Sequence, residues 1–263
     1  MARLTIDIVI PIIPAHHTYL PRLFRELRCS TVLPEKLIIA ASSQTTSSTK
    51  YLAKITTGLP FDTEILATSK PLPAGSNRNR GLKKSESDYV TFCDADDSYS
   101  NIRLEFLLQI AKEFDPDLIL HNYSRLKPRF YLHILPPKNI LINQTDIYKS
   151  TFPNGLRNLE QETGIKGDTN LIMPPGTKNN WRIHHGHATV KRTIDLEYGV
   201  RAFGEDGQFC RDILFSGKKV YYTPNKLSNY DRPTCLNLFK KSFLRIYVEL
   251  AKLKNRVKLY IRL

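Results

Sequence analysis

The residues whose types and spacing are best suited to binding or catalysis form one short stretch, Asp94-Ala95-Asp96-Asp97. It follows the apolar run 89–93, which predicts a buried strand. Three carboxylates within four residues repel one another, because two unit charges about 4 Å apart cost about 4 kcal/mol at an effective dielectric constant near 20. Mg²⁺ or Mn²⁺ relieves this repulsion and prefers oxygen ligands. The stretch therefore predicts a divalent metal site that also holds diphosphate oxygens.

A second interpretation of the same residues is purely structural. Asp96, Asp97 and Ser98 have side chains that cap helices, and a helix is predicted from Ile102 onward. Short acidic triplets of this kind are common, so the stretch taken alone leaves both the metal site and the helix cap open.

Two further segments carry groups that handle anions and protons. At a predicted helix start, Gly75 permits close approach of the backbone, and Arg78 or Arg80 could bind phosphate through paired N–H groups. Glu205 and Asp206 begin a later predicted helix, where one carboxylate could take a proton from a hydroxyl. Each segment also has a structural alternative: a solvated helix start for the first, and acids that complement the helix dipole for the second.

The elements that must position these groups alternate along the chain. Apolar and amphipathic runs predict strands at 6–13, 36–41, 63–67, 89–93, 118–121 and 219–222, and helices at 19–27, 49–55, 74–84, 102–114 and 205–215. Such alternation implies a parallel α/β sheet with helices on both faces. Ligands of these sheets bind beyond the carboxyl ends of the strands. We therefore expect 11–17, 42–44 and 94–97 to lie close together.

Two other segments carry information about surfaces. Within the helix 19–27, apolar residues at helical spacing place Arg22, Arg25 and Glu26 on the outer face. The segment 125–180 is rich in proline and glycine, and long loops in a compact domain often bind ligands.

In order and spacing, these segments resemble inverting glycosyltransferases of the GT-A fold and of the family 2 type, over residues 6–232. The matching segments are Ile8-Val9-Ile10-Pro11 for the opening strand, Arg78, Asn79 and Gly81 for the family's Ala-Arg-Asn-x-Gly segment, Asp94-Ala95-Asp96 for its Asp-x-Asp signature, Glu205-Asp206 followed by Arg211, and the strand segment 217–224. The resemblance implies a Rossmann-like sandwich with a mainly parallel central sheet.

The resemblance also implies roles for individual residues. Asp94 would contact the nucleotide ribose and help hold the metal, Asp96 would bind the metal that bridges the diphosphate, and Arg78 would help hold the donor. Asp206 would be the base that activates the acceptor hydroxyl, and Glu205 would support the acceptor site. The other residues expected to line the nucleotide-sugar site are Pro11, Ile12, Ser42 and Ala95.

The implied reaction transfers a sugar, with inversion, from a nucleotide-diphosphate sugar to a hydroxyl of a glycan or lipid-linked acceptor, with Mn²⁺ or Mg²⁺ as cofactor. A UDP-sugar is the favoured donor. The family usually has aspartates after its second strand that read the uracil ring, whereas this chain has Ala41, Ser42 and Ser43, so the donor stays open. His184, His185 and His187 could add a metal or diphosphate ligand, or be ordinary loop histidines.

Charge divides the chain of 263 residues into two parts. The net charge is +14, and residues 236–263 carry eight basic residues and one acidic residue, which is +7. We expect a catalytic domain at 1–235 and a basic amphipathic helix at 236–263. That helix either lies on an anionic membrane or packs on protein.

Two rival functions fit less well. A sugar nucleotidyltransferase is expected to have a glycine-rich loop after its first strand, but 11–17 contains no glycine. A nucleic-acid-binding protein should interleave basic and aromatic residues on one surface, whereas half of this charge lies in one terminal segment. No run reaches the roughly 18 apolar residues of a spanning helix, so we expect a cytoplasmic protein, peripheral at the membrane face if 236–263 binds lipid.

Overall fold

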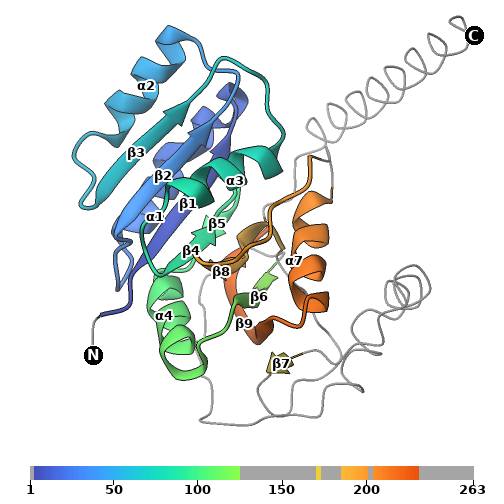
Figure 1. Ribbon diagram of the computed structural model, residues 1–263. Coiled ribbons are helices and arrows are strands. Elements are labelled where there is room, and N and C mark those ends of the chain that lie inside the picture. The colour runs from blue at the N-terminus through green and yellow to red at the C-terminus, as the bar shows by residue number, and fades with distance from the viewer. Residues whose placement is uncertain (1–2, 125–169, 173–184, 201–203, 231–263) are drawn as a thin grey trace, which may run out of the picture. The chain divides into compact units, whose positions relative to one another are not determined.

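The computed structural model describes residues 3–124, 170–172, 185–200 and 204–230 (Figure 1). The segment 236–263, for which an amphipathic helix is predicted, lies outside these ranges. Among the described residues, no helix has both the length and the apolar character needed to cross a bilayer.

One nine-stranded sheet forms the centre of the described fold, in the order β3-β2-β1-β4-β8-β6-β9-β5 with β7 beside β9. The first four strands in the chain are parallel, as the sequence predicts: β1 (Ile6–Ile12), β2 (Lys36–Ala41), β3 (Asp62–Ala67) and β4 (Tyr89–Phe92). All residues of β1 are buried, as expected of a central parallel strand that is covered on both faces.

The other half of the sheet is mixed. The remaining strands are β5 (Ser98–Tyr99), β6 (Leu118–Ser124), β7 (Asn170–Ile172), β8 (Thr189–Lys191) and β9 (Lys219–Asn229). The β8 strand runs antiparallel between β4 and β6, and β9 is parallel to β6 and antiparallel to β5. The sequence does not predict β5, β7 or β8, because two or three residues are too few for a periodic pattern.

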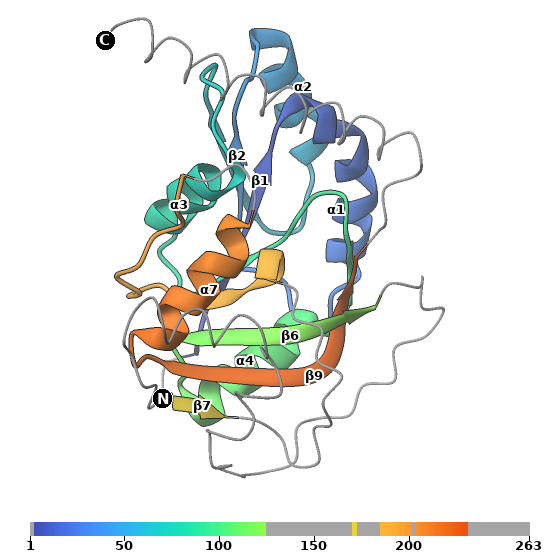
Figure 2. The same cartoon turned by 90° about the vertical axis from the view of Figure 1, so that its right-hand side faces the viewer.

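Helices cover both faces of the sheet, as predicted (Figure 2). One face packs against α1 (Leu20–Arg28), α2 (Thr46–Thr56) and α4 (Arg103–Phe114), and the other against α3 (Ala74–Lys84) and α7 (Glu205–Phe215). Alternation along β1 produces the two cores, since Ile8 and Ile10 join the first and Val9 joins the second. The α/β fold class expected from the sequence is therefore confirmed.

The carboxyl ends of β1, β2 and β4 meet at one edge of the sheet. The main-chain N–H of Ser42 donates to the Ile12 carbonyl at 3.0 Å, and that of Cys93 donates to the Val9 carbonyl at 3.0 Å. The acids that follow β4 thus emerge beside the ends of β1 and β2, where ligands of open α/β sheets bind.

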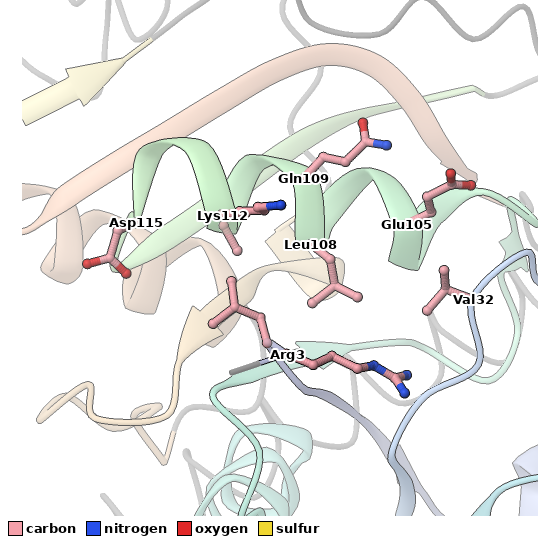
Figure 3. Close-up of a pocket in the computed structure, with 9 residues that line it drawn as sticks. Arg3, Val32, Glu105, Leu108, Gln109, Lys112 and Asp115 are labelled. Atoms are coloured by element: carbon pink, nitrogen blue, oxygen red, sulfur yellow. The ribbon is translucent and has the colours of Figure 1, made fainter. Parts of the chain in front are cut away.

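A hollow of about 750 Å³ lies elsewhere, at the opposite edge of the sheet (Figure 3). Leu4, Val32 and Leu108 contribute apolar surface to it, and Asp115 lies at one end of its lining. Leu4 precedes β1 and Asp115 precedes β6, so the hollow lies at the amino ends of these parallel strands. It is therefore separate from the acids that follow β4.

A glycine allows α3 to pack tightly on β1. A Cβ atom at Gly81 would lie 2.3 Å from Cγ1 of Val9. Gly81→Ala should therefore lower the free energy of unfolding by about 1–3 kcal/mol through overpacking, although the same change in an open helix stabilises by about 1 kcal/mol. Urea denaturation measures the difference.

Gly199→Ala is the matched control, since no heavy atom lies within 4 Å of its added Cβ. We expect it to change stability by less than about 0.5 kcal/mol. A Gly81→Ala variant as stable as the parent would show that α3 does not depend on this close approach.

Candidate active site

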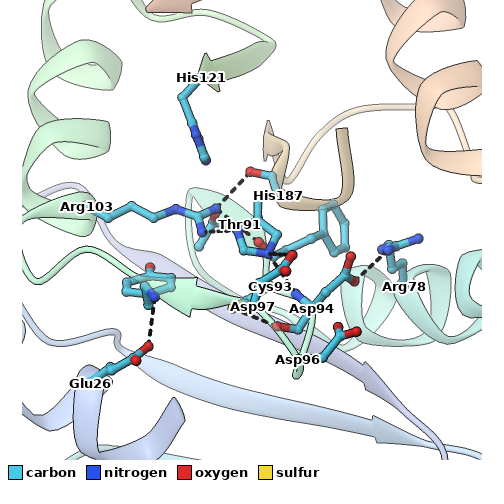
Figure 4. A network of polar contacts seen from close by, with 12 residues as sticks. Glu26, Arg78, Thr91, Cys93, Asp94, Asp96, Asp97, Arg103, His121 and His187 are labelled. Carbon is cyan, nitrogen blue, oxygen red and sulfur yellow. Dashed lines mark hydrogen bonds and ion pairs between the residues drawn. The ribbon is translucent and has the colours of Figure 1, made fainter. Parts of the chain in front are cut away.

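The acidic loop, residues 94–97, lies at the carboxyl end of β4 (Figure 4). Asp94 and Asp96 are partly exposed, whereas Asp97 is buried. One ligand atom each of Asp94, Asp97 and His187 lie within 4.8 Å of one another. The structure therefore gathers potential metal ligands where the sequence predicts them, but this group of three contains Asp97 and His187 rather than Asp96.

The capping interpretation of these acids is wrong. The helix α4 begins at Arg103, its N-cap residue is Ile102, and no side chain caps it. The short strand β5 lies between the acidic loop and the helix and pairs with β9. The carboxylate of Asp97 instead faces Nε2 of His187 at 3.3 Å.

Arg78 joins three of the residues singled out in the sequence. Its Nη2 donates to Asp94 Oδ1 at 2.8 Å and its Nη1 donates to Glu205 Oε1 at 2.9 Å, and the arginine side chain is 3% exposed. Burial opposes its charge, but Asp94 and Glu205 outweigh that effect and raise the pKa of the guanidinium. The ring of Tyr198 packs against it, 5.3 Å from the guanidinium carbon. Arg78 thus braces the acidic loop against the start of α7.

Four other predicted site residues are buried at the same edge. Pro11 and Ile12 end β1, and Ala95 lies within the acidic loop. The Ser42 hydroxyl accepts from Asn77 Nδ2 at 2.9 Å and donates to the Leu72 carbonyl at 3.3 Å. Because Ser42 is fully buried and bonded on both sides, its hydroxyl is engaged by the protein itself.

The two acids at the start of α7 diverge. Glu205 is buried and points to Arg78, whereas Asp206 is partly exposed and its Oδ1 accepts from the main-chain N–H of Gly207 at 2.8 Å. The preceding Gly204 has a φ of 74°, a left-handed conformation that favours glycine. This turn lets the chain enter α7 with the two carboxylates side by side but in different environments.

Arg103 and His187 form a buried pair beside the acidic loop (Figure 4). Arg103 Nη2 donates to Thr91 Oγ1 at 2.8 Å, to the Phe92 carbonyl at 3.0 Å and to the His187 carbonyl at 2.8 Å. Its Nη1 lies 2.8 Å from Nδ1 of His187. Sequence reasoning assigned no role to Arg103. The available signal is its place in the first turn of a helix, where a cation opposes the helix dipole.

Donors approach both ring nitrogens of His187. Arg103 Nη1 lies 2.8 Å from Nδ1, and a guanidinium carries donors only. The main-chain N–H of Asp94, the first residue of the acidic loop, donates to Nε2 at 3.0 Å. The ring is thus held between α4 and the acidic loop, with Asp97 Oδ2 3.3 Å from Nε2.

The buried Arg103 network generates a prediction about stability. Arg103→Met would leave the buried carbonyls of Phe92 and His187 without this donor, at about 1–3 kcal/mol for each group left unsatisfied, whereas Thr91 Oγ1 would keep its bond from the Thr189 hydroxyl. We expect a loss of about 3 kcal/mol or more in the free energy of unfolding, measured in urea. Lys112→Met, at an exposed position of the same helix, should be nearly neutral, and equal effects of the two changes would contradict the assigned network.

The architecture, a mainly parallel sheet that carries acids at the exit of β4, is that of GT-A-type glycosyltransferases. Solved structures with this fold include S. aureus TarS residues 1–349 in complex with UDP-GlcNAc (TM-score 0.59, 13% identity, 88% of this chain and 59% of that chain). Another is the mannosyltransferase PcManGT from Pyrobaculum calidifontis in complex with GDP-Man and Mn²⁺ (TM-score 0.58, 13% identity, 89% and 59%).

The chain belongs to glycosyl transferase family 2, whose model matches residues 7–169. A curated relative is the glycosyltransferase GlyA of Streptococcus pneumoniae serotype 4, which is 25% identical over 177 residues. That match covers 65% of this chain and 22% of the relative, so the chain spans only part of the relative's length.

Proposed function

We propose that this protein transfers a sugar from a nucleotide-diphosphate sugar to an acceptor hydroxyl, with a divalent cation and with inversion at the anomeric carbon. The observation that carries the proposal is the double contact of Arg78. It ties Asp94 of the acidic loop to Glu205 beside Asp206, in a family 2 chain. Arg78 thereby connects a proposed cation ligand to the residue that precedes the candidate base.

The donor is a nucleoside diphosphate sugar, and we propose a UDP-sugar as the first to test. TarS was solved with UDP-GlcNAc and PcManGT with GDP-Man, so proteins of this fold accept different bases. Ser42, at the position where the family often has a base-reading acid, is engaged by Asn77 and Leu72. We therefore assign no base specificity to Ser42.

The residues of the acidic loop fit Mn²⁺ or Mg²⁺, since carboxylate oxygens are the ligands these ions prefer. We propose that Asp96 and Asp94 hold the ion, with Asp97 fixed beside them by His187. The ion would stabilise negative charge on the departing diphosphate. PcManGT was solved with Mn²⁺ bound, which supports Mn²⁺ as the first choice.

The protein's own groups then have separate tasks in the displacement. The partly exposed carboxylate of Asp206 would take the proton of the acceptor hydroxyl as its oxygen bonds to the anomeric carbon. At the same time the bond from that carbon to the diphosphate oxygen breaks, so the configuration inverts. Glu205, bound to Arg78, would hold the start of α7 next to the acidic loop rather than transfer a proton.

Two substitutions should separate cation binding from proton transfer. Asp96→Ala should abolish the Mn²⁺-dependent rise in melting temperature with a nucleoside diphosphate. Asp206→Asn should keep that rise but lower sugar transfer by at least about 100-fold, because a general base contributes about 10²–10⁴. Thermal shift with UDP and GDP, and release of nucleoside diphosphate from the donor sugar, measure the two effects.

Asp212→Asn is the control, since Asp212 lies on the same helix but is exposed. It should change neither readout. Full transfer activity in Asp206→Asn would disprove the base assignment, and no Mn²⁺-dependent stabilisation of the parent chain by any nucleoside diphosphate would contradict the proposed function.

For the acceptor we propose a glycan or a lipid-linked sugar, with the basic segment 236–263 in contact with an anionic membrane. Its charge of +7 and its apolar residues at three- and four-residue spacing support this proposal. Packing of the segment on protein is the alternative.

Vesicle flotation distinguishes these two possibilities. The full chain should float with vesicles that contain anionic lipid at low salt, and a chain truncated before Leu236 should not. The difference should shrink at high salt, because charge attraction is screened. Equal flotation of the two chains would contradict membrane contact through this segment.

A further inference from the structure

We propose that Arg22 and Glu26 of α1 are positioning residues that hold the main chain of the acidic loop in its cation-binding conformation. Sequence periodicity places both side chains on the outer face of the helix, and the structure corrects that placement, because both are half-buried against the loop. The proposal rests on the cation site put forward above, and it concerns how the chain shapes that site.

Arg22 holds the loop by its carbonyl groups. Its Nη2 donates to the carbonyl oxygen of Asp96 at 2.7 Å and to that of Asp97 at 3.1 Å. Two consecutive carbonyls directed at one nitrogen fix the two peptide planes. The direction in which each aspartate side chain leaves the backbone is thereby fixed as well.

Glu26 holds the chain two residues after the acidic loop. Its Oε2 accepts from the main-chain N–H of Tyr99 at 2.8 Å (Figure 4). Residues 22 and 26 are four positions apart, so their side chains lie on one face of α1, a single turn from each other. Tyr99 also pairs with Ser228 of β9, which anchors this end of the loop to the sheet.

The contacts of Arg22 and Glu26, here called the clamp, matter because the carboxylates of the acidic loop are unfavourable neighbours. The carboxylates of Asp94, Asp96 and Asp97 repel one another, and a mobile loop would separate them when no cation is bound. A cation would then have to order the loop on binding and would bind less tightly. Groups that orient metal ligands from behind typically change metal affinity by 10–100-fold when they are removed.

Charge and positioning predict opposite effects for Arg22, and this makes the proposal testable. A guanidinium near a cation site repels the cation, so loss of its charge alone should strengthen Mn²⁺ binding. Loss of the two carbonyl contacts should weaken it. A third possibility, that Arg22 only attaches α1 to the sheet, predicts lower stability with unchanged Mn²⁺ affinity of the folded chain.

The experiment is a titration of the full chain with Mn²⁺ alone, in which free Mn²⁺ is followed by electron paramagnetic resonance. We expect Arg22→Ala to raise the Kd by about 10–100-fold. Arg22→Lys should recover most of the affinity, because an ammonium group can still donate to both carbonyls. Arg25→Ala is the matched control, since Arg25 has the same charge and is exposed on the same helix; its Kd should be unchanged or slightly lower.

Circular dichroism confirms that each variant is folded at the titration temperature. If Arg22→Ala is not folded, Arg22→Gln takes its place, and we expect the Kd to be raised in that variant too. A Kd equal to or below that of Arg25→Ala would overturn the clamp and leave the proposed function intact. If the unsubstituted chain binds no Mn²⁺, the cation site fails and the clamp fails with it.

Discussion

Mutual repulsion among the carboxylates that follow β4 is the constraint around which the described structure is organised. Each side of the acidic loop meets a different arginine. Arg78 binds Asp94 directly, Arg103 fixes His187 beside Asp97, and Arg22 holds the carbonyls of the loop. Only the first of these neutralises a carboxylate by direct contact. The remaining negative charge is what a divalent cation and a diphosphate could use.

The same contacts connect the loop to the rest of the fold. Arg78 comes from α3, whose close approach to β1 depends on Gly81, and its second carboxylate partner begins α7. Arg103 begins α4, and Arg22 lies on α1. Helices from both faces of the sheet therefore meet at the carboxyl edge, where open α/β sheets bind ligands. Contacts from both faces of the sheet therefore hold the acidic loop in place.

Short-range sequence patterns predict the strands and the position of the acidic loop, but not the contacts between residues far apart in the chain. Continuous apolar runs such as β1 and β2 were found from the sequence, as was the acidic loop at the end of β4. The support of the loop was not, since Arg103 and His187 are 84 residues apart and meet through pairing that involves the three-residue strand β8. Helical periodicity places Arg22 on the polar face of its helix but does not show which part of the protein that face contacts.

The most direct test of the cation site is anomalous diffraction from crystals grown with Mn²⁺ and a nucleoside diphosphate. We expect a manganese peak in contact with the carboxylate of Asp96 and with oxygens of the diphosphate. A diphosphate bound at this edge with no manganese beside the acidic loop, or manganese bound only elsewhere, would contradict the central claim.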